Sequence, residues 1–351
     1  MEPRGSVAGV ENRRMSAGDR QDERIAWLER LRPQGAPDPA GIARDLAWLS
    51  EPGRTLLTAD DPRYPSQLAA VPGMPPALFV TGDPALLARP QVAIVGSRSA
   101  TVAGRETAFD FAARLAAHGF AITSGLATGI DAAAHRGALA AGGVTVAVCG
   151  TGPDRVYPAE HRALAGEIAA SGALVSEFPT GTAPAPYNFP RRNRLMSGLS
   201  RGVLVVEAAA RSGSLITARL AGEQGREVMA VPGSIHNPLA RGCHRLIKDG
   251  AALVESVDDV LAALGVTGLE GARDSSAQPR DIAKIPDVAL DRDAEMLLNA
   301  LGFEPTDLDR LVERTGMAAR SVISTLQLLE LEGRVESLAG GRYSRTTARR
   351  S

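Results

Sequence analysis

The stretch VAIVGSRSATVAG, residues 92 to 104, decides the fold, because a short apolar run passes directly into a glycine-containing turn and then into a helix. Each later run of this kind is also continuously apolar, which is typical of strands that helices cover on both faces. The sequence therefore predicts a doubly wound α/β domain with a mostly parallel sheet. The later runs are FAIT (120–123), VTVAVC (144–149), ALVS (173–176), VLVVE (203–207) and EVMAV (227–231).

The loops that follow these runs differ from the loops that precede them. Those after the runs read GSRSAT, SGLATGID, GTGPDRVYP, SEFPTG and EAAARSGSLIT, and they are rich in glycine, serine, threonine and arginine. Those at the other edge, such as AAHG and AAGG, lack this character. Because ligands of such domains bind at the carboxyl ends of the strands, we expect the functional site at that edge.

The first of these turns contains Gly96, Ser97 and Arg98. Backbone amides and a helix N-terminus converge in such a turn and favour an anion, usually a phosphate, which the arginine would clamp. The spacing matches neither a dinucleotide fingerprint nor a P-loop, so no cofactor is expected. The alternative is a tight turn with a solvated arginine. A second anion site is predicted where Ser212, Gly213 and Ser214 open another helix.

Between these two turns, the stretch PYNFPRRNR (186–194) interleaves two aromatic residues with three arginines. Aromatic rings stack on unpaired bases while arginines neutralise the phosphate backbone, so the stretch predicts nucleic-acid binding. The alternative is an ordinary helix start with Phe189 in the core. The stretch follows the fourth run and therefore belongs to the same edge of the sheet.

The loop SGLATGIDAAAH (124–135) brings glycines that allow close approach to a ligand, and it places Asp131 and His135 four residues apart on one helix face. An acidic residue in a first helical turn is favoured by the helix dipole in any case, and no nucleophile pairs with His135. We therefore expect structural roles for both. His236, Cys243 and His244 lack further ligands at suitable spacing, so no metal is expected.

The length, composition and net charge of the chain limit the classes of protein to which it can belong. The chain has 351 residues, 44% of them hydrophobic and 23% charged, which suits one full-size domain with one or two small ones. A net charge of −1 excludes a globally basic nucleic-acid binder, so any nucleic acid needs a concentrated site. The two cysteines, the absence of a signal-peptide core in residues 1–24 and the absence of a long apolar stretch predict a cytoplasmic protein without a membrane association.

The C-terminal part predicts a second small domain. PTDLDRLVERTG opens a helix with Thr306 as the expected N-cap, and the following helix and hairpin complete a winged-helix pattern. The helix that would enter a DNA groove carries Arg320 and little other positive charge. We therefore expect this domain to contact protein or to serve as an accessory module.

The motifs VAIVGSR, SGLATGIDAAAH, VYP, FPRRNRLMSGLS and EAAARSGSLITA, in this order, resemble the DNA-processing protein A (DprA/Smf) family of bacteria over about residues 60 to 265. The resemblance implies an extended Rossmann-like fold, often with a winged helix. It also implies a non-enzymatic homodimer that binds single-stranded DNA, protects incoming strands and loads the RecA recombinase during natural transformation. The implied DNA-binding residues are Gly96, Ser97, Arg98, Ser124, Gly125, Gly129, Phe189, Arg191, Arg192, Asn193, Arg194, Ser212, Gly213 and Ser214.

The alternative function is a Rossmann-type nucleotide-processing hydrolase that resembles phosphoribohydrolases. Such enzymes carry a PGG-x-G-T-x-x-E signature, whereas the corresponding turn here reads RSGSLITA without the glutamate. The expected domain organisation is a disordered tail (1–24), a short helical remnant (25–58), the Rossmann-like DNA-binding domain (59–267), a linker (268–289) and the winged helix (290–346).

Overall fold

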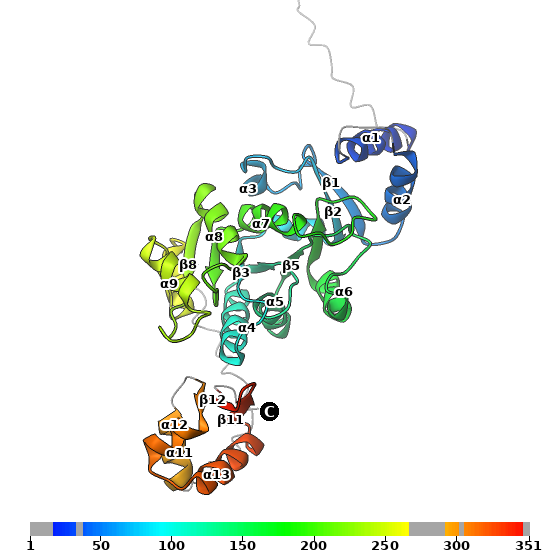
Figure 1. The fold of residues 1–351 in the computed structure, drawn as a ribbon. Coiled ribbons are helices and arrows are strands. Elements are labelled where there is room, and N and C mark those ends of the chain that lie inside the picture. Colours follow the sequence, from blue (N-terminus) through cyan, green and yellow to red (C-terminus); the bar gives the residue numbers. More distant parts are fainter. Residues whose placement is uncertain (1–16, 33–37, 267–291, 302–304, 347–351) are drawn as a thin grey trace, which may run out of the picture.

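A nine-stranded sheet forms the centre of the computed structural model, which describes residues 17–32, 38–266, 292–301 and 305–346 (Figure 1). Its strands are β1 (Arg54–Thr58), β2 (Ala77–Gly82), β3 (Gln91–Val95), β4 (Ala121–Ser124), β5 (Thr145–Val148), β6 (Ala173–Ser176), β7 (Gly202–Val205), β8 (Glu227–Ala230) and β9 (Ala252–Leu253). They lie in the order β1-β2-β6-β5-β4-β3-β7-β8-β9. From β6 to β9 all neighbours are parallel, whereas β2 pairs antiparallel with both β1 and β6.

Helices cover both faces of the sheet, as the continuously apolar runs predict. In β3, Ala93 and Val95 pack into the core on one face, and Val92 and Ile94 pack into the core on the other. The first core is closed by α3, α7, α8 and α9, and the second by α4, α5 and α10, with α6 beside α5. The bounds are α3 (Ser66–Ala69), α4 (Val102–Ala117), α5 (Ile130–Ala140), α6 (Arg162–Ser171), α7 (Asn188–Leu199), α8 (Ser214–Glu223), α9 (Arg241–Lys248) and α10 (Val257–Ala263).

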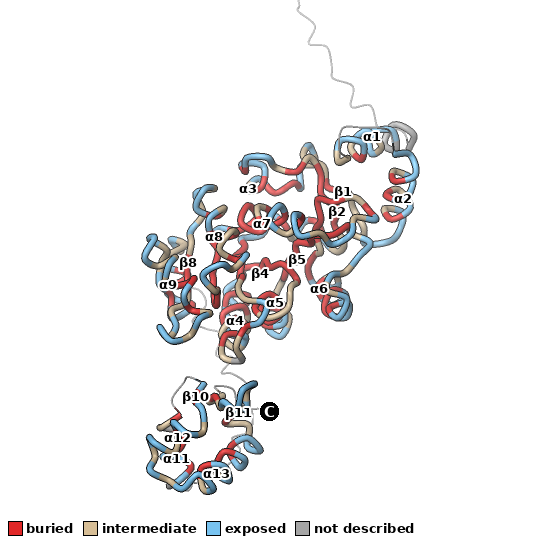
Figure 2. Tube along the Cα trace, in the orientation of Figure 1, coloured by how far each residue is buried: buried red, intermediate tan, exposed pale blue. Residues whose placement is uncertain are grey.

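The six predicted strands are confirmed, and the buried residues concentrate along them (Figure 2). The predicted domain limits need two corrections at the N-terminal side. Helix α1 (Ala17–Arg30) begins inside the expected tail 1–24, and β1 lies inside the segment 25–58 that we expected to be helical. Of that segment, α2 (Pro39–Leu49) is helical, with Asp38 as its N-cap. The rest of the tail, residues 1–16, and the expected linker 268–289 lie outside the described residues.

The N-terminal helices pack on the sheet through a small apolar cluster. Trp48 of α2 is 5% exposed and meets the ring of Phe79 on β2 edge to face, with ring centroids 5.6 Å apart. Leu28 of α1 is fully buried in the same cluster. This contact joins the helices to the β1–β2 end of the sheet.

The C-terminal part is a winged helix, as the sequence predicts, with Val322, Leu326 and Leu329 buried in its core. The expected N-cap is wrong: Thr306 lies in a strand, and Asp307 caps the helix by accepting a 2.8 Å hydrogen bond from the Arg310 N–H. The elements are α11 (Arg292–Leu301), β10 (Thr306–Asp307), α12 (Leu308–Thr315), α13 (Ala319–Leu331), β11 (Val335–Leu338) and β12 (Arg342–Arg345).

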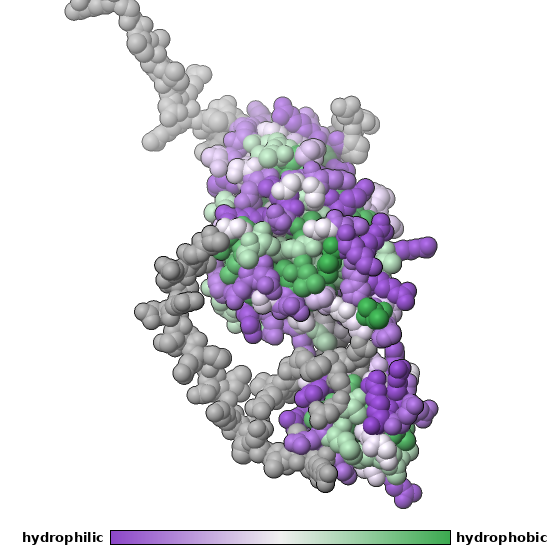
Figure 3. Space-filling model, turned by 90° about the vertical axis from the view of Figure 1, so that its left-hand side faces the viewer, coloured by the Kyte–Doolittle hydropathy of each residue, from purple (hydrophilic) through white to green (hydrophobic). Residues whose placement is uncertain are grey.

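Apolar side chains also reach the surface on the side of α9 and β8. The view from that side shows apolar areas between hydrophilic borders in the sheet-bearing part (Figure 3). Leu253 on the edge strand β9 is half exposed, and Ile235 in the loop after β8 is exposed. Over the described ranges, every helix falls short of the length and apolar character needed to cross a bilayer.

Candidate nucleic-acid interface

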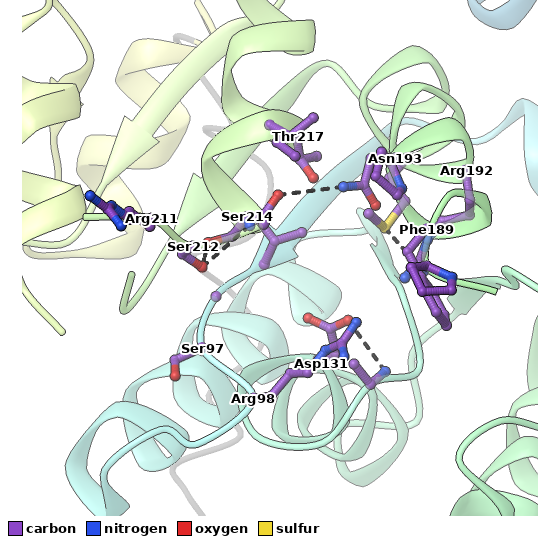
Figure 4. A pocket seen from close by; sticks show the side chains of 18 of the residues that line it. Ser97, Arg98, Asp131, Phe189, Arg192, Asn193, Arg211, Ser212, Ser214 and Thr217 are labelled. Carbon is purple, nitrogen blue, oxygen red and sulfur yellow. Dashed lines mark hydrogen bonds between the residues drawn. The ribbon is translucent and has the colours of Figure 1, made fainter. Parts of the chain in front are cut away.

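A cavity of about 730 Å³ opens at the carboxyl edge of the sheet. Its walls come from the loops after β3 and β5, the start of α7 and the turn before α8 (Figure 4). These segments meet because parallel strands of one sheet end at the same edge, which is where the sequence predicts the site. The predicted site residues that line the cavity are Gly96, Ser97, Arg98, Phe189, Arg192, Asn193, Ser212, Gly213 and Ser214.

The N-terminus of α4, which we expected to bind an external phosphate, holds a carboxylate of the protein itself. The buried Glu207, just after β7, accepts hydrogen bonds from the Thr101 N–H at 2.9 Å and the Thr101 hydroxyl at 2.7 Å. Its backbone oxygen accepts from the Ser97 N–H at 2.7 Å. A negative charge is favourable at a helix N-terminus, and Glu207 supplies it. The Ser97 amide is thus already bonded within the protein, and phosphate binding by the Gly96-Ser97-Arg98 turn stays a prediction.

The side chain of Arg98 remains exposed and lies over an aromatic ring. Its guanidinium carbon is 5.2 Å from the centroid of the Phe189 ring, which is a cation–π contact. Phe189 lies half-buried in the first turn of α7, and its ring centroid is 5.7 Å from that of Tyr157. Arg98 is exposed, as in the solvated-arginine alternative, but its guanidinium is also held over the ring. Phe189 is only half-buried, so the alternative that places it in the core is wrong. The cavity therefore has an aromatic wall with a cation in front of it.

Arg192 forms the buried cationic wall of the cavity. It is 4% exposed, and its Nη1 donates to the Val148 backbone oxygen at 2.5 Å. Gly125 makes room for it, since a Cβ there would lie 2.1 Å from Nη1. Burial lowers the pKa of Arg192 and the nearby carboxylate of Asp131 raises it, so the guanidinium stays charged. Its buried Nε has no hydrogen-bond partner in the described protein.

The turn before α8 provides the second predicted anion site. Ser212 and Ser214 share a hydrogen bond between their hydroxyls at 2.7 Å, and Ser214 is the first residue of the ten-residue helix α8. Asn193 reaches across from α7, where its Nδ2 lies 3.5 Å from the Gly213 oxygen. The positive end of the α8 dipole therefore faces the cavity from the side opposite Arg98.

Two predicted arginines, Arg191 and Arg194, do not line the cavity. Arg194 forms a short ion pair with Glu177, and Arg191 lies 3.3 Å from the same carboxylate. Arg191 also lies over the Phe178 ring, at 5.3 Å from its centroid. Burial raises the pKa of Glu177, and the two arginines oppose that rise. The structure therefore places both guanidinium groups in a fold-stabilising cluster and not in the cavity lining.

Two other predicted residues, Ser124 and Gly129, lie behind the cavity lining and not in it. The Ser124 hydroxyl donates to the Ile94 oxygen at 2.7 Å inside the sheet. Gly129 has a φ of +76°, and a Cβ there would lie 2.2 Å from the Ser97 oxygen. Gly129 therefore shapes the turn that carries Ser97 and Arg98, and Ser124 ties two neighbouring strands together. Like Gly125, neither residue lines the cavity.

Asp131 and His135 do not form an acid–base pair. His135 is fully buried, and its Nδ1 shares a 2.7 Å hydrogen bond with the Thr145 hydroxyl. Burial lowers the pKa of His135 to about 3, so the ring is neutral at physiological pH. Asp131 borders the cavity with a buried carboxylate, whose pKa is raised by burial and lowered by Arg192. The structural role expected for His135 is confirmed, whereas Asp131 also belongs to the cavity.

The predicted set of site residues missed Tyr157 and Arg211, which both line the cavity. Their loops carry signals, because VYP and RSGS each follow a strand at the correct edge. Cys243 is buried and donates to the Val205 oxygen at 3.7 Å, and burial raises its pKa to about 11. Within the residues that the structure describes, no group of three or more His, Cys, Asp or Glu side chains is placed to hold a metal ion.

Comparison with known proteins gives two family matches. Residues 55–265 match the model of DNA recombination-mediator protein A, and residues 283–341 match the DprA winged helix domain. The chain belongs to the DNA recombination-mediator protein A family. The resemblance seen in the sequence is thereby confirmed, and the family assignment agrees with the mostly parallel sheet and the C-terminal winged helix.

Individual relatives of this family cover most of the chain. Protein Smf from Escherichia coli strain K12 is 47% identical over 303 residues, which are 86% of this chain and 80% of that protein. The X-ray structure of DNA processing protein A from Streptococcus pneumoniae is 42% identical, with a TM-score of 0.60 over 64% of this chain and 78% of that one. A structure of the Helicobacter pylori protein, which reports its single-stranded DNA binding mode, is 29% identical, with a TM-score of 0.54 over 60% of this chain and 95% of that one.

Proposed function

We propose that the chain binds single-stranded DNA in the cavity at the carboxyl edge of the sheet. The observation that carries the proposal is the Arg98 guanidinium over the Phe189 ring, 5.2 Å from its centroid, at the mouth of a cavity whose inner wall is Arg192. An aromatic ring beside cations suits a strand whose bases are unpaired. The single-stranded DNA binding mode described for the Helicobacter pylori relative supports the proposal.

The contact between Arg98 and Phe189 suggests how a strand would bind. A base stacked on Phe189 and the Arg98 guanidinium compete for the same ring. Binding of a base is therefore expected to release the guanidinium toward the phosphate backbone, where a charge-assisted hydrogen bond replaces the cation–π contact. The turn before α8 offers a second phosphate position across the cavity.

The mediator role completes the proposal. The chain would protect incoming DNA, load RecA onto it during natural transformation and act in the cytoplasm as a homodimer. The exposed apolar residues Leu253 and Ile235 support a contact with a second copy. A RecA-loading assay on DNA coated with a single-strand-binding protein tests the mediator role, and sedimentation tests the dimer.

A nucleotide hydrolase is the less favoured function. His135, the base that Asp131 would have to assist, is bonded to Thr145 in the core and is kept neutral by burial. We infer that the cavity binds nucleic acid without cleaving it. Release of free base or phosphate from nucleoside monophosphates by the purified protein would contradict this.

The deciding experiment measures binding of a labelled oligothymidine by fluorescence anisotropy across a salt series. We expect wild type to bind with a log–log salt slope near −0.7 for each phosphate neutralised, and duplex DNA to compete poorly. Arg98→Ala is expected to weaken binding and to make the slope less negative. Arg136→Ala, an exposed arginine on α5 outside the cavity lining, is the matched control and should match wild type. Binding that is indifferent to Arg98, or equal binding of duplex, would refute the proposal.

A further inference from the structure

One buried carboxylate connects the N-terminal helices to the loops that build the cavity. Asp45 on α2 is fully buried, and its Oδ1 accepts from the Thr180 N–H at 2.9 Å and from the Thr180 hydroxyl at 2.6 Å. Its Oδ2 lies 2.7 Å from the Arg32 guanidinium, just after α1. Removing one partner of such a buried ionic cluster leaves an uncompensated charge, so the cluster holds its members firmly in place.

Thr180 lies in the segment 177–187, which connects β6 to α7. This segment is bonded to the loop after β5 at two neighbouring points. The Gly152 N–H donates to the Thr182 oxygen at 3.0 Å, and the Gly181 N–H donates to the Asp154 carboxylate at 2.8 Å. The residue that Asp45 holds is therefore part of a paired loop structure and not of an isolated loop.

Both of these loops end at the cavity. The segment 177–187 contributes Pro184 and Pro186 to its lining and runs directly into the first turn of α7, which carries Phe189. The loop after β5 contributes Tyr157, whose ring lies 5.7 Å from that of Phe189. A shift of Thr180 thus displaces the two aromatic rings of the cavity together.

We propose that Asp45 is a positioning residue for the DNA site, coupling the docking of α1 and α2 to the placement of Tyr157 and Phe189. The inference rests on the proposed single-stranded DNA binding and adds to it an N-terminal element that lies outside the cavity lining. Because coupling is reciprocal, DNA in the cavity also strengthens the docking of the two helices.

The chain carries its own probe of this docking. Its two tryptophans, Trp27 and Trp48, both lie in the N-terminal helices, and Trp48 is buried against Phe79. Tryptophan fluorescence therefore follows undocking of α1 and α2, whereas far-UV circular dichroism follows the whole fold. Anisotropy of a labelled oligothymidine reports DNA binding separately.

The variants are Asp45→Ala, Asp45→Asn and Thr180→Val in the full chain. We expect Asp45→Ala to raise the Kd for oligothymidine about 2-fold to 30-fold. The salt slope should stay unchanged, because no phosphate-binding charge is lost. Asp45→Asn keeps an acceptor for Thr180 and should lie between Asp45→Ala and wild type. Glu29→Gln is the matched control, since Glu29 is an exposed carboxylate on α1 that lies outside the Asp45 cluster and the cavity lining.

The reciprocal measurement follows tryptophan fluorescence in denaturant with and without oligothymidine. In wild type, oligothymidine should move the unfolding transition to a higher denaturant concentration. In Asp45→Ala this shift should be smaller. If Asp45 had only a structural role, Asp45→Ala would lower the midpoint of the unfolding transition, but oligothymidine would shift that midpoint as much as in wild type.

Equal affinity for DNA in wild type and in folded Asp45→Ala and Thr180→Val would overturn this inference while leaving the proposed function intact. If Asp45→Ala does not fold, Thr180→Val decides, because it removes only the hydroxyl hydrogen bond and keeps the side-chain shape. Failure of wild type to bind oligothymidine would overturn the proposed function and this inference together.

Discussion

The carboxyl edge of the sheet and the winged helix are both candidate regions for binding nucleic acid. Their surfaces differ in charge and in apolar character. At the sheet edge, Arg98, Arg192 and Arg211 border a cavity with an aromatic wall. On α13 of the winged helix, Leu328 and Leu331 are exposed at 61% and 86%, and Arg320 is the one basic residue of the helix. A winged helix often places such a helix in a DNA groove, but α13 has little positive charge for this contact. We therefore expect the DNA site at the edge of the sheet.

Among the variants that test the difference between the two regions, we expect the largest loss of DNA affinity when the aromatic ring of Phe189 is removed. Phe189→Ala should cost about 1 to 3 kcal/mol of binding to oligothymidine through lost stacking, with little change in salt slope. Tyr187→Ala is the matched control, because Tyr187 is 76% exposed two residues away and does not line the cavity. Anisotropy titrations of both variants test this, and equal losses in the two would contradict an aromatic site at Phe189.

The two regions also differ in how their stability responds to acid. His135 has a pKa of about 3 in the fold, against about 6.5 when unfolded, because burial disfavours the charged ring. The unfolded chain therefore binds a proton first, and stability is lost as the pH falls from about 6.5 toward 3. By about pH 5 this loss amounts to about 2 kcal/mol. The winged helix contains no histidine and lacks this contribution.

This loss is measured by denaturant unfolding at about pH 7 and about pH 5, followed by circular dichroism. His135→Gln should reduce the difference between the two pH values by the amount that the histidine contributes. An unchanged difference in His135→Gln would show that the ring titrates in the fold as freely as in the unfolded chain.

The smallest expected effect is on the winged helix. Arg320→Ala should change the Kd for oligothymidine by less than about 2-fold and leave the salt slope as it is, since no phosphate is neutralised there. Arg98→Ala, measured in the same titration, is the positive comparison. If Arg320→Ala weakens binding as strongly as Arg98→Ala, the contrast between the two regions is wrong.

The parts of the fold that were predicted are those with a strong local pattern. Five-residue β3 is buried at every position, and such continuously apolar runs were identified correctly. Three strands of the sheet were missed. β1 has a single fully buried residue, Leu57, and β9 has only two residues. The exception is β2, whose ALFV run is buried throughout and was nonetheless missed. The expected helical segment 25–58 was therefore too long, because β1 reads as polar from its sequence alone.

The sequence by itself determined the parallel sheet, the polar edge where its strands end, and the residue types at that edge, because these follow from hydrophobic periodicity and short motifs. Only the tertiary structure decided which charges remain available at the cavity. Glu207 reaches Thr101 across 106 residues, Asp45 reaches Thr180 across 135, and Glu177 draws Arg194 away from the cavity. Such pairings depend on the spatial order of the strands, so no local pattern records them.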